Sequence, residues 1–109
     1  MLDGAEFIQT PDFRCAAAVL SSARLAVLPE GGLHHAAAAV GTAAVVIFGG
    51  FISPAQTGYA GQTNFHRGGR PCGMRVRCEH CARAMAEISP EEVFEAARGI
   101  LRGQREAAA

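Results

Sequence analysis

The chain has 109 residues, which makes it one small domain at most and too short for an enzyme that must clamp two substrates by itself. Its ten arginines balance ten acidic residues, and this zero net charge argues against bulk nucleic-acid binding and against a polybasic membrane surface. Half of the residues are hydrophobic, but many of these are alanine, so we expect a core made by thin, closely packed helices.

The N-terminal segment has acidic residues ahead of any apolar run and no basic stretch. It therefore does not resemble a signal peptide, and we expect a cytoplasmic protein. Residues 10–12 (Thr-Pro-Asp) predict a helix start, with Thr10 as the N-cap, proline in the first helical position and a carboxylate in the first turn. This first helix should end near Ser21 and Ser22.

Residues 25–48 predict a strand, a turn, a helix and a second strand. Leu25–Leu28 is a short all-apolar run, as in a strand that is covered on both faces in a parallel sheet. Residues 29–32 (Pro-Glu-Gly-Gly) break this strand. An alanine-rich helix should follow over Leu33–Val40, and Gly41 should close it in a left-handed conformation. Residues 43–48 (AAVVIF) then predict a second buried strand and complete a βαβ unit.

The uncharged run from Ala36 to Ile52 covers only 17 residues and is interrupted by glycines. A transmembrane helix needs about 20 apolar residues. We therefore interpret this run as a buried helix followed by a buried strand, and expect no transmembrane segment.

The second half of the chain begins with a long segment of weak structural signal. Residues 49–73 are rich in Gly, Pro, Ser, Thr and Asn, so we predict a long irregular loop region with a cysteine cluster over 49–83. Ser89 and Glu92 then form a capping box around Pro90, which predicts a final helix. Gly103 is a plausible end for this helix.

The turn between the first strand and the helix is the main candidate for a ligand site. Free N–H groups at a helix start, together with the helix dipole, bind phosphate, and glycines let a diphosphate approach the backbone. The candidate donor-binding residues are Glu30, Gly31, Gly32, Leu33 and His35. The alternatives are glycines required by turn geometry alone and a carboxylate that only caps the helix. Adjacent histidines at 34 and 35 point about 100° apart on a helix, so one should pack or reach solvent while the other faces the cleft.

A second candidate site contains cysteines and histidines. Three thiolates and one imidazole can hold a tetrahedral zinc ion. The weak candidates for such ligands are Cys72, Cys78, Cys81 and His80, with His66 nearby in sequence. The five-residue gap between Cys72 and Cys78 is not a standard finger spacing, so reduced or disulfide-forming cysteines are favoured, and we expect no metal or other cofactor. Cys15 is best explained as a small core residue.

Four segments resemble, in order and spacing, the bacterial ADP-heptose:lipopolysaccharide heptosyltransferases and their relatives in glycosyltransferase family nine. EGGLHHAAAAVG is similar to the Asp-Ser/Thr-Gly-x-x-His-x-x-Ala-Ala stretch of this family, and VVIFGGFISP to the strand and Phe-Gly turn after it. TGY is similar to a later loop, and CGMRVRCEHC with ISPEEV to the cysteine-containing tail before the last helix. The resemblance runs from about Thr10 to Leu101.

The resemblance implies that residues 1–109 form a single partial domain of the α/β class, with short parallel strands flanked by helices. It would be the Rossmann-like C-terminal half of a GT-B enzyme and would bind an ADP-heptose-like nucleotide sugar. Gly32 and His35 match the family, whereas Glu30 stands where aspartate is usual and Gly31 where Ser or Thr is usual. The sugar would pass to a cell-envelope carbohydrate, such as the lipopolysaccharide core, bound by an N-terminal domain that has no counterpart here.

The same resemblance implies no catalytic residue in this chain, because the acidic base of the family lies in the acceptor domain. We therefore expect the chain alone to be inactive, and a complete enzyme could lie peripherally at the inner membrane. Two alternatives remain open at this point. One is a small structural zinc- or thiol-binding module, and the other is an inactive fragment that folds only by association.

Overall fold

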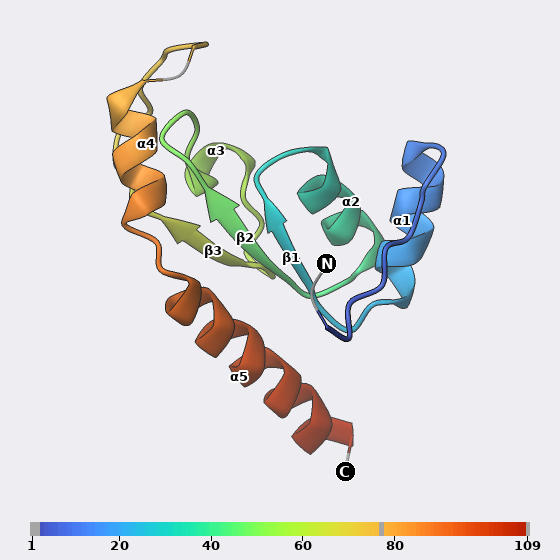
Figure 1. Ribbon diagram of the computed structural model, residues 1–109. Helices are drawn as coiled ribbons and strands as arrows, with labels where there is room; N and C mark the ends of the chain where they lie inside the picture. Colours follow the sequence, from blue (N-terminus) through green and yellow to red (C-terminus); the bar gives the residue numbers. More distant parts are fainter. Residues whose placement is uncertain (1–2, 77, 109) are drawn as a thin grey trace.

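The structure is a computed structural model that describes residues 3–76 and 78–108. It is an α/β fold with a three-stranded parallel sheet flanked by helices (Figure 1). The strands lie in the order β1-β2-β3. In chain order the elements are α1 (Phe13–Ser22), β1 (Ala26–Pro29), α2 (Gly32–Val40), β2 (Ala44–Phe48), α3 (Pro54–Thr57), β3 (Thr63–His66), α4 (Glu79–Ala86) and α5 (Pro90–Ala108).

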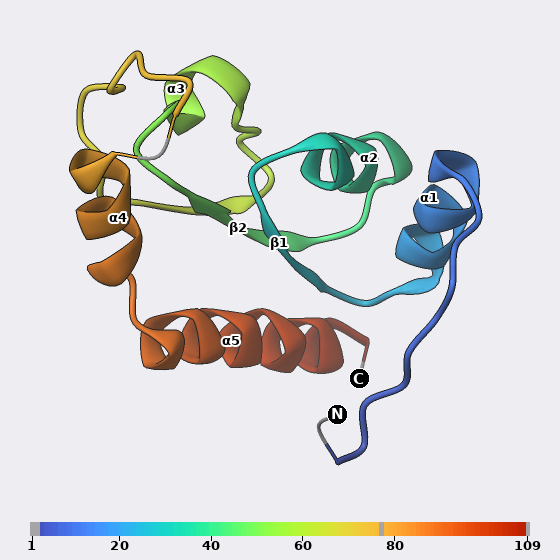
Figure 2. The ribbon, with the colours of Figure 1, turned by 45° about the horizontal axis from the view of Figure 1, so that its top comes forward.

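The helices lie on both faces of the sheet. In Figure 2, α2 covers one face with α1 beside it, while α5 runs along the opposite face. The buried hydroxyl of Thr42 donates a hydrogen bond of 2.6 Å to the carbonyl of Leu20, which joins the end of α1 to the turn after α2. Among the described helices, none combines the length and the apolar character needed to cross a membrane.

The core lies between α2 and the sheet and is made largely of small residues. Ala44, Val46 and Phe48 alternate along β2 and belong to one buried cluster. Ala36 and Ala37 of α2 belong to the same cluster and are 6% and 0% exposed. Because alanine lacks a long side chain, α2 can pack close to the strands, as the composition predicted.

The opposite face of the sheet is covered less completely. Ile47 of β2 lines a hollow together with Met85 of α4 and Val93 of α5. Val27 of β1 is 49% exposed, and Phe94 of α5 is 60% exposed. None of the described residues of α5 is buried, so this long helix contacts the sheet only along a narrow stripe.

The predicted βαβ unit is confirmed. β1, α2 and β2 lie within one or two residues of the predicted bounds, and β1 pairs in parallel with β2 from Ala26↔Ala44 onward. Gly41 ends α2 in the left-handed conformation, with φ 78°. The run from residue 36 to 52 thus contains the end of α2, in which Ala36 and Ala37 are buried, and the largely buried strand β2, whereas residues 49–52 lie beyond the strand.

The start of the first helix differs from the prediction. The N-cap is Asp12 instead of Thr10, and its carboxylate accepts a hydrogen bond of 2.8 Å from the N–H of Cys15. This backbone hydrogen bond holds the pKa of Asp12 below its usual value. A carboxylate caps at least as well as a hydroxyl, so the later of the two capping residues is used.

The end of the last helix also differs from the prediction. Gly103 does not stop α5, which continues to Ala108. A glycine inside a helix is unfavourable by only about 1 kcal/mol relative to alanine, and the residues around it are good helix formers.

Residues 49–83 are less irregular than predicted, because they contain α3, β3 and the first half of α4. β3 pairs in parallel with β2, with Val45 opposite Thr63 and Phe48 opposite His66. The four residues of β3 (TNFH) give too short a pattern for sequence analysis. Pairing with the buried neighbouring strand stabilises an extended conformation that the local sequence does not specify.

The capping box at the start of α5 is confirmed. Glu92 donates its N–H to the Ser89 hydroxyl at 3.1 Å and accepts the Ser89 N–H on its carboxylate at 2.9 Å. The Ser89 N–H is the main cause that lowers the pKa of Glu92, and Arg67, which forms an ion pair with Glu92 at 2.7 Å, lowers it further.

We expect Ser89→Ala to lower the free energy of unfolding by about 1 kcal/mol, because the Glu92 N–H loses its acceptor. Ser21→Ala is the matched control, since the exposed Ser21 hydroxyl caps no helix start, and it should change stability by less than about 0.5 kcal/mol. Urea titrations of both variants measure the difference. Equal stability of the two variants would contradict a capping role for Ser89.

Candidate functional site

The turn from Pro29 to Gly32 joins β1 to α2 at the carboxyl edge of the sheet. All three strands are parallel, so the loops that leave their carboxyl ends meet at this one edge. Ligands of open α/β sheets bind at this edge, outside the ends of the strands. The N–H of Glu30 donates to the carbonyl of Ile47 at 2.9 Å, so the sheet pairing continues up to the turn.

The conformation of Gly31 is one that other residues avoid. Its φ is 154° and its ψ is −166°, and Gly31 is the N-cap of α2. Its N–H donates a hydrogen bond of 2.9 Å to Nδ1 of His34. This N–H is therefore used inside the protein, and Gly31 shapes the turn.

The next two backbone N–H groups, those of Gly32 and Leu33, point out of the first turn of α2. Within the described part of the chain, neither donates a hydrogen bond. The first N–H groups of any helix lack intrahelical acceptors, and the helix dipole adds partial positive charge there. Gly32 and Leu33 thus provide two adjacent donors for an anion.

The missing side chain of Gly32 lies next to the ring of Phe13. A Cβ at Gly32 would lie 3.4 Å from Cε2 of Phe13, and no side chain or backbone lies near the corresponding position of Gly31. The Phe13 ring would thus be in ordinary van der Waals contact with a Cβ at Gly32.

His34 holds the turn together and was given no role by the sequence analysis. Its side chain is fully buried at 0% exposure. Because Nδ1 accepts from Gly31, Nε2 carries the proton and donates to the carbonyl of Thr57 at 2.8 Å. The backbone carbonyl of His34 accepts a further bond of 2.9 Å from the Gln62 amide. The sequence holds one local signal of this role. His34 stands three residues after the N-cap Gly31, the spacing at which the side chain in a capping box accepts the N–H of the N-cap residue.

His35 and Glu30 lie beside the turn. His35 is exposed, and its Nδ1 lies 2.6 Å from the Tyr59 hydroxyl. As expected, one of the two histidines, His34, packs in the interior, although the two rings lie 4.1 Å apart. The carboxylate of Glu30 lies within 4.8 Å of ligand atoms of both histidines. Both ring nitrogens of His34 already have protein partners, so these three residues do not form a metal site.

The cysteines before and at the start of α4 form a separate cluster. Sγ of Cys81 lies 3.4 Å from Sγ of Cys72 and 3.3 Å from Sγ of Cys78, and the thiols are free. The N–H of Cys81 lowers the pKa of Cys78, whereas hydrogen bonding to the Cys78 and Cys72 sulfurs raises the pKa of Cys81 to about 12. His80 lies outside this group and packs against Gly50 instead.

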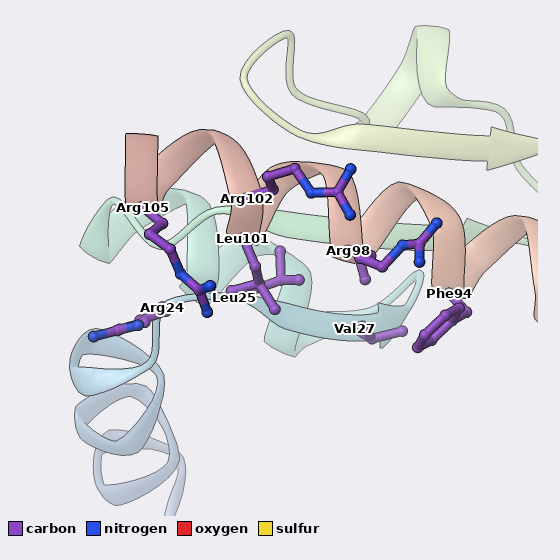
Figure 3. Close-up of a pocket in the computed structure, with 9 residues that line it drawn as sticks. Arg24, Leu25, Val27, Phe94, Arg98, Leu101, Arg102 and Arg105 are labelled. Carbon is purple, nitrogen blue, oxygen red and sulfur yellow. The ribbon is translucent and has the colours of Figure 1, made fainter. Parts of the chain in front are cut away.

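A third feature was missed by the sequence analysis. A groove of about 610 Å³ lies between β1 and α5, on the face of the sheet away from α2 (Figure 3). Its apolar lining includes Val27, Leu101 and the ring of Phe94, and four arginines surround it: Arg24, Arg98, Arg102 and Arg105. Arg98, Arg102 and Arg105 follow one another along α5, and the packing of α5 on β1 adds Arg24 to them.

Comparisons of the chain with protein families, with curated proteins and with solved structures found no match.

We expect His34→Ala to lower the free energy of unfolding by about 3 kcal/mol, because it leaves the Gly31 N–H and the Thr57 carbonyl without partners and opens a cavity. His35→Ala is the matched control and should lower it by about 1 kcal/mol or less, since only the hydrogen bond to Tyr59 is lost. Chemical denaturation followed by circular dichroism measures both values. If the His35 variant were the less stable of the two, the structural role assigned to His34 would be wrong.

Proposed function

We propose that the protein binds a nucleotide-sugar donor at the β1–α2 turn and acts as the donor-binding part of a glycosyltransferase. The donor is an ADP-sugar of the heptose type, and the acceptor is a cell-envelope carbohydrate such as the lipopolysaccharide core. The acceptor binds to a further domain, and transfer takes place in the cytoplasm, where the protein can associate peripherally with the inner membrane.

One observation carries this proposal: two adjacent backbone donors, those of Gly32 and Leu33, open α2 at the carboxyl edge of a parallel sheet. A diphosphate placed there accepts both N–H groups and gains from the positive end of the helix dipole. The alternative, in which the glycines serve only turn geometry, explains Gly31 and leaves the N–H groups of the exposed residues Gly32 and Leu33 to water.

Glu30 and His35 support a sugar nucleotide over a simple phosphate. The half-buried carboxylate of Glu30 follows β1 directly and can accept hydrogen bonds from two sugar hydroxyls. The Tyr59 hydroxyl fixes the His35 ring through Nδ1, so that Nε2 can face a ligand. Both side chains flank the turn that holds the diphosphate.

The chemistry that this site supplies is positioning and stabilisation of charge. The diphosphate is the leaving group, and its negative charge increases as the bond to the sugar breaks. Backbone donors that are already oriented stabilise that charge without reorganisation. The base that activates the acceptor belongs to the acceptor domain in this proposal.

The Gly32 N–H can be tested without disturbing the helix, because proline is favoured at the first helical position. We expect Gly32→Pro to weaken binding of ADP at least tenfold, about 1.4 kcal/mol, since it removes one phosphate donor. Gly32→Ala keeps the N–H and adds only a Cβ at 3.4 Å from Phe13, so it should bind ADP nearly as well as the unchanged protein.

Isothermal titration calorimetry with ADP on the unchanged protein and on both variants gives these values. Equal affinity of the proline and alanine variants would place the diphosphate elsewhere. If the unchanged protein bound neither ADP nor an ADP-sugar, the proposed function would be contradicted.

Glu30→Gln tests the contact to the sugar. It keeps the shape of the side chain and removes its charge, so hydrogen bonds to sugar hydroxyls become weaker while the phosphate contacts remain. We expect a clear loss of affinity for an ADP-sugar and a smaller change for ADP, both measured by calorimetry. A larger effect on ADP than on the ADP-sugar would show that Glu30 does not contact the sugar.

A further inference from the structure

Three of the four cysteines converge on one point outside the donor turn. Cys72 comes from the loop before α4, Cys78 is the N-cap of α4, and Cys81 lies in its first turn. We propose that Cys72, Cys78 and Cys81 bind one zinc ion through their thiolates and that this ion holds the loop before α4 in place.

The distances between the sulfur atoms fit a metal site better than a disulfide. A disulfide bond is about 2.05 Å long. The two shorter separations here are 3.3 and 3.4 Å, and Cys81 is equally close to both partners, so neither pair is selected for oxidation. Thiolates at about 2.3 Å from a tetrahedral zinc ion lie about 3.8 Å apart, so a shift of a few tenths of an ångström suffices.

The backbone around the sulfur atoms is arranged as for thiolates. The N–H of Met74 donates to Sγ of Cys72 at 3.4 Å, and the N–H of Cys81 hydrogen-bonds to Cys78. Cys78 and Cys81 also lie at the start of α4, where the helix dipole favours negative charge. Hydrogen bonds of this kind orient the ligands of metal sites and stabilise their charge.

Cys72 is brought to the pair by a backbone contact rather than by sequence spacing. Its N–H donates to the carbonyl of Gly50 at 2.9 Å, just beyond the end of β2. This contact explains how Cys72 and Cys78 can bind one ion although five residues separate them in sequence. That unusual spacing was the reason for favouring free or disulfide-forming cysteines from the sequence.

The fourth position on the ion belongs to water. His80 does not share the cluster, since its ring lies against Gly50, where an added Cβ would meet Cδ2 at 2.6 Å. Cys81 instead lines an open hollow together with Phe51 and Arg75. Three thiolates and Zn²⁺ carry a net charge of −1, and the Arg75 guanidinium in this hollow offsets it. Zinc is the metal chosen here because it combines soft thiolate ligands with tetrahedral geometry.

The test uses the full chain, reduced and freed of metal, titrated with Zn²⁺ against a chromophoric chelator. We expect one zinc ion per chain, and we expect Co²⁺ in its place to give the charge-transfer and visible bands of a tetrahedral thiolate site. Replacing Cys72, Cys78 or Cys81 by serine should weaken zinc binding at least a hundredfold. Cys15→Ser is the matched control, because Cys15 lies on α1, and it should bind zinc like the unchanged chain.

A second measurement does not depend on how well the variants fold. In the unchanged chain, one equivalent of Zn²⁺ should protect three of the four thiols from alkylation, as counted by mass spectrometry. His80→Ala should keep its affinity for zinc within a few fold. Equal alkylation with and without zinc, or loss of zinc by the Cys15 or His80 variant equal to that of the Cys78 variant, would overturn the proposal.

Discussion

The two hydrogen bonds of the buried His34 imidazole hold the β1–α2 turn, where the proposed donor site lies. It accepts the N–H of Gly31 and donates to the carbonyl of Thr57, two groups that the chain separates by 26 positions. Both bonds require a neutral ring with its proton on Nε2. Once Gly31 is satisfied in this way, the next free donors are those of Gly32 and Leu33. A buried side chain thus determines which N–H groups at the start of α2 remain free for a ligand.

The alanine content of the chain has a structural consequence beyond a small core. Ala36 and Ala37 bring α2 close to Val46 and Phe48, so the helix start is fixed against the end of β1. Large side chains in α2 would move this helix away from the sheet and shift the donors with it. The other face shows the contrast, because α5 places no described residue in a buried position and leaves an open groove beside β1. Close packing is thus concentrated on the face of the sheet that α2 covers.

Sequence analysis predicted the parts of this fold that are specified locally. The apolar runs of β1 and β2 and the alanine-rich α2 each carry enough pattern to be recognised. β3 could not be predicted, because its four residues become a strand only by pairing with β2. The role of His34 was missed because its partner Thr57 is distant in sequence. Of the candidate site, the turn and its residues were identified, but the use of the Gly31 N–H and the position of Phe13 depend on contacts that no spacing rule gives.

Gly50 brings the cysteine cluster close to the end of β2. Its carbonyl accepts the N–H of Cys72, and a Cβ at Gly50 would lie 2.6 Å from the His80 ring. A Cβ at Gly68 would lie 2.9 Å from the Cα of Gly50. Only glycine allows the loop and α4 to come this near to the end of β2, the same edge of the sheet that carries the donor turn. Ala84 is the one buried residue among those described in α4, so aliphatic packing contributes little to holding this helix. Three thiolates on one ion would supply the stabilisation that the small apolar surface lacks, so that coordination would hold the loop before α4 and His34 would hold the β1–α2 turn, both at the same edge of the sheet.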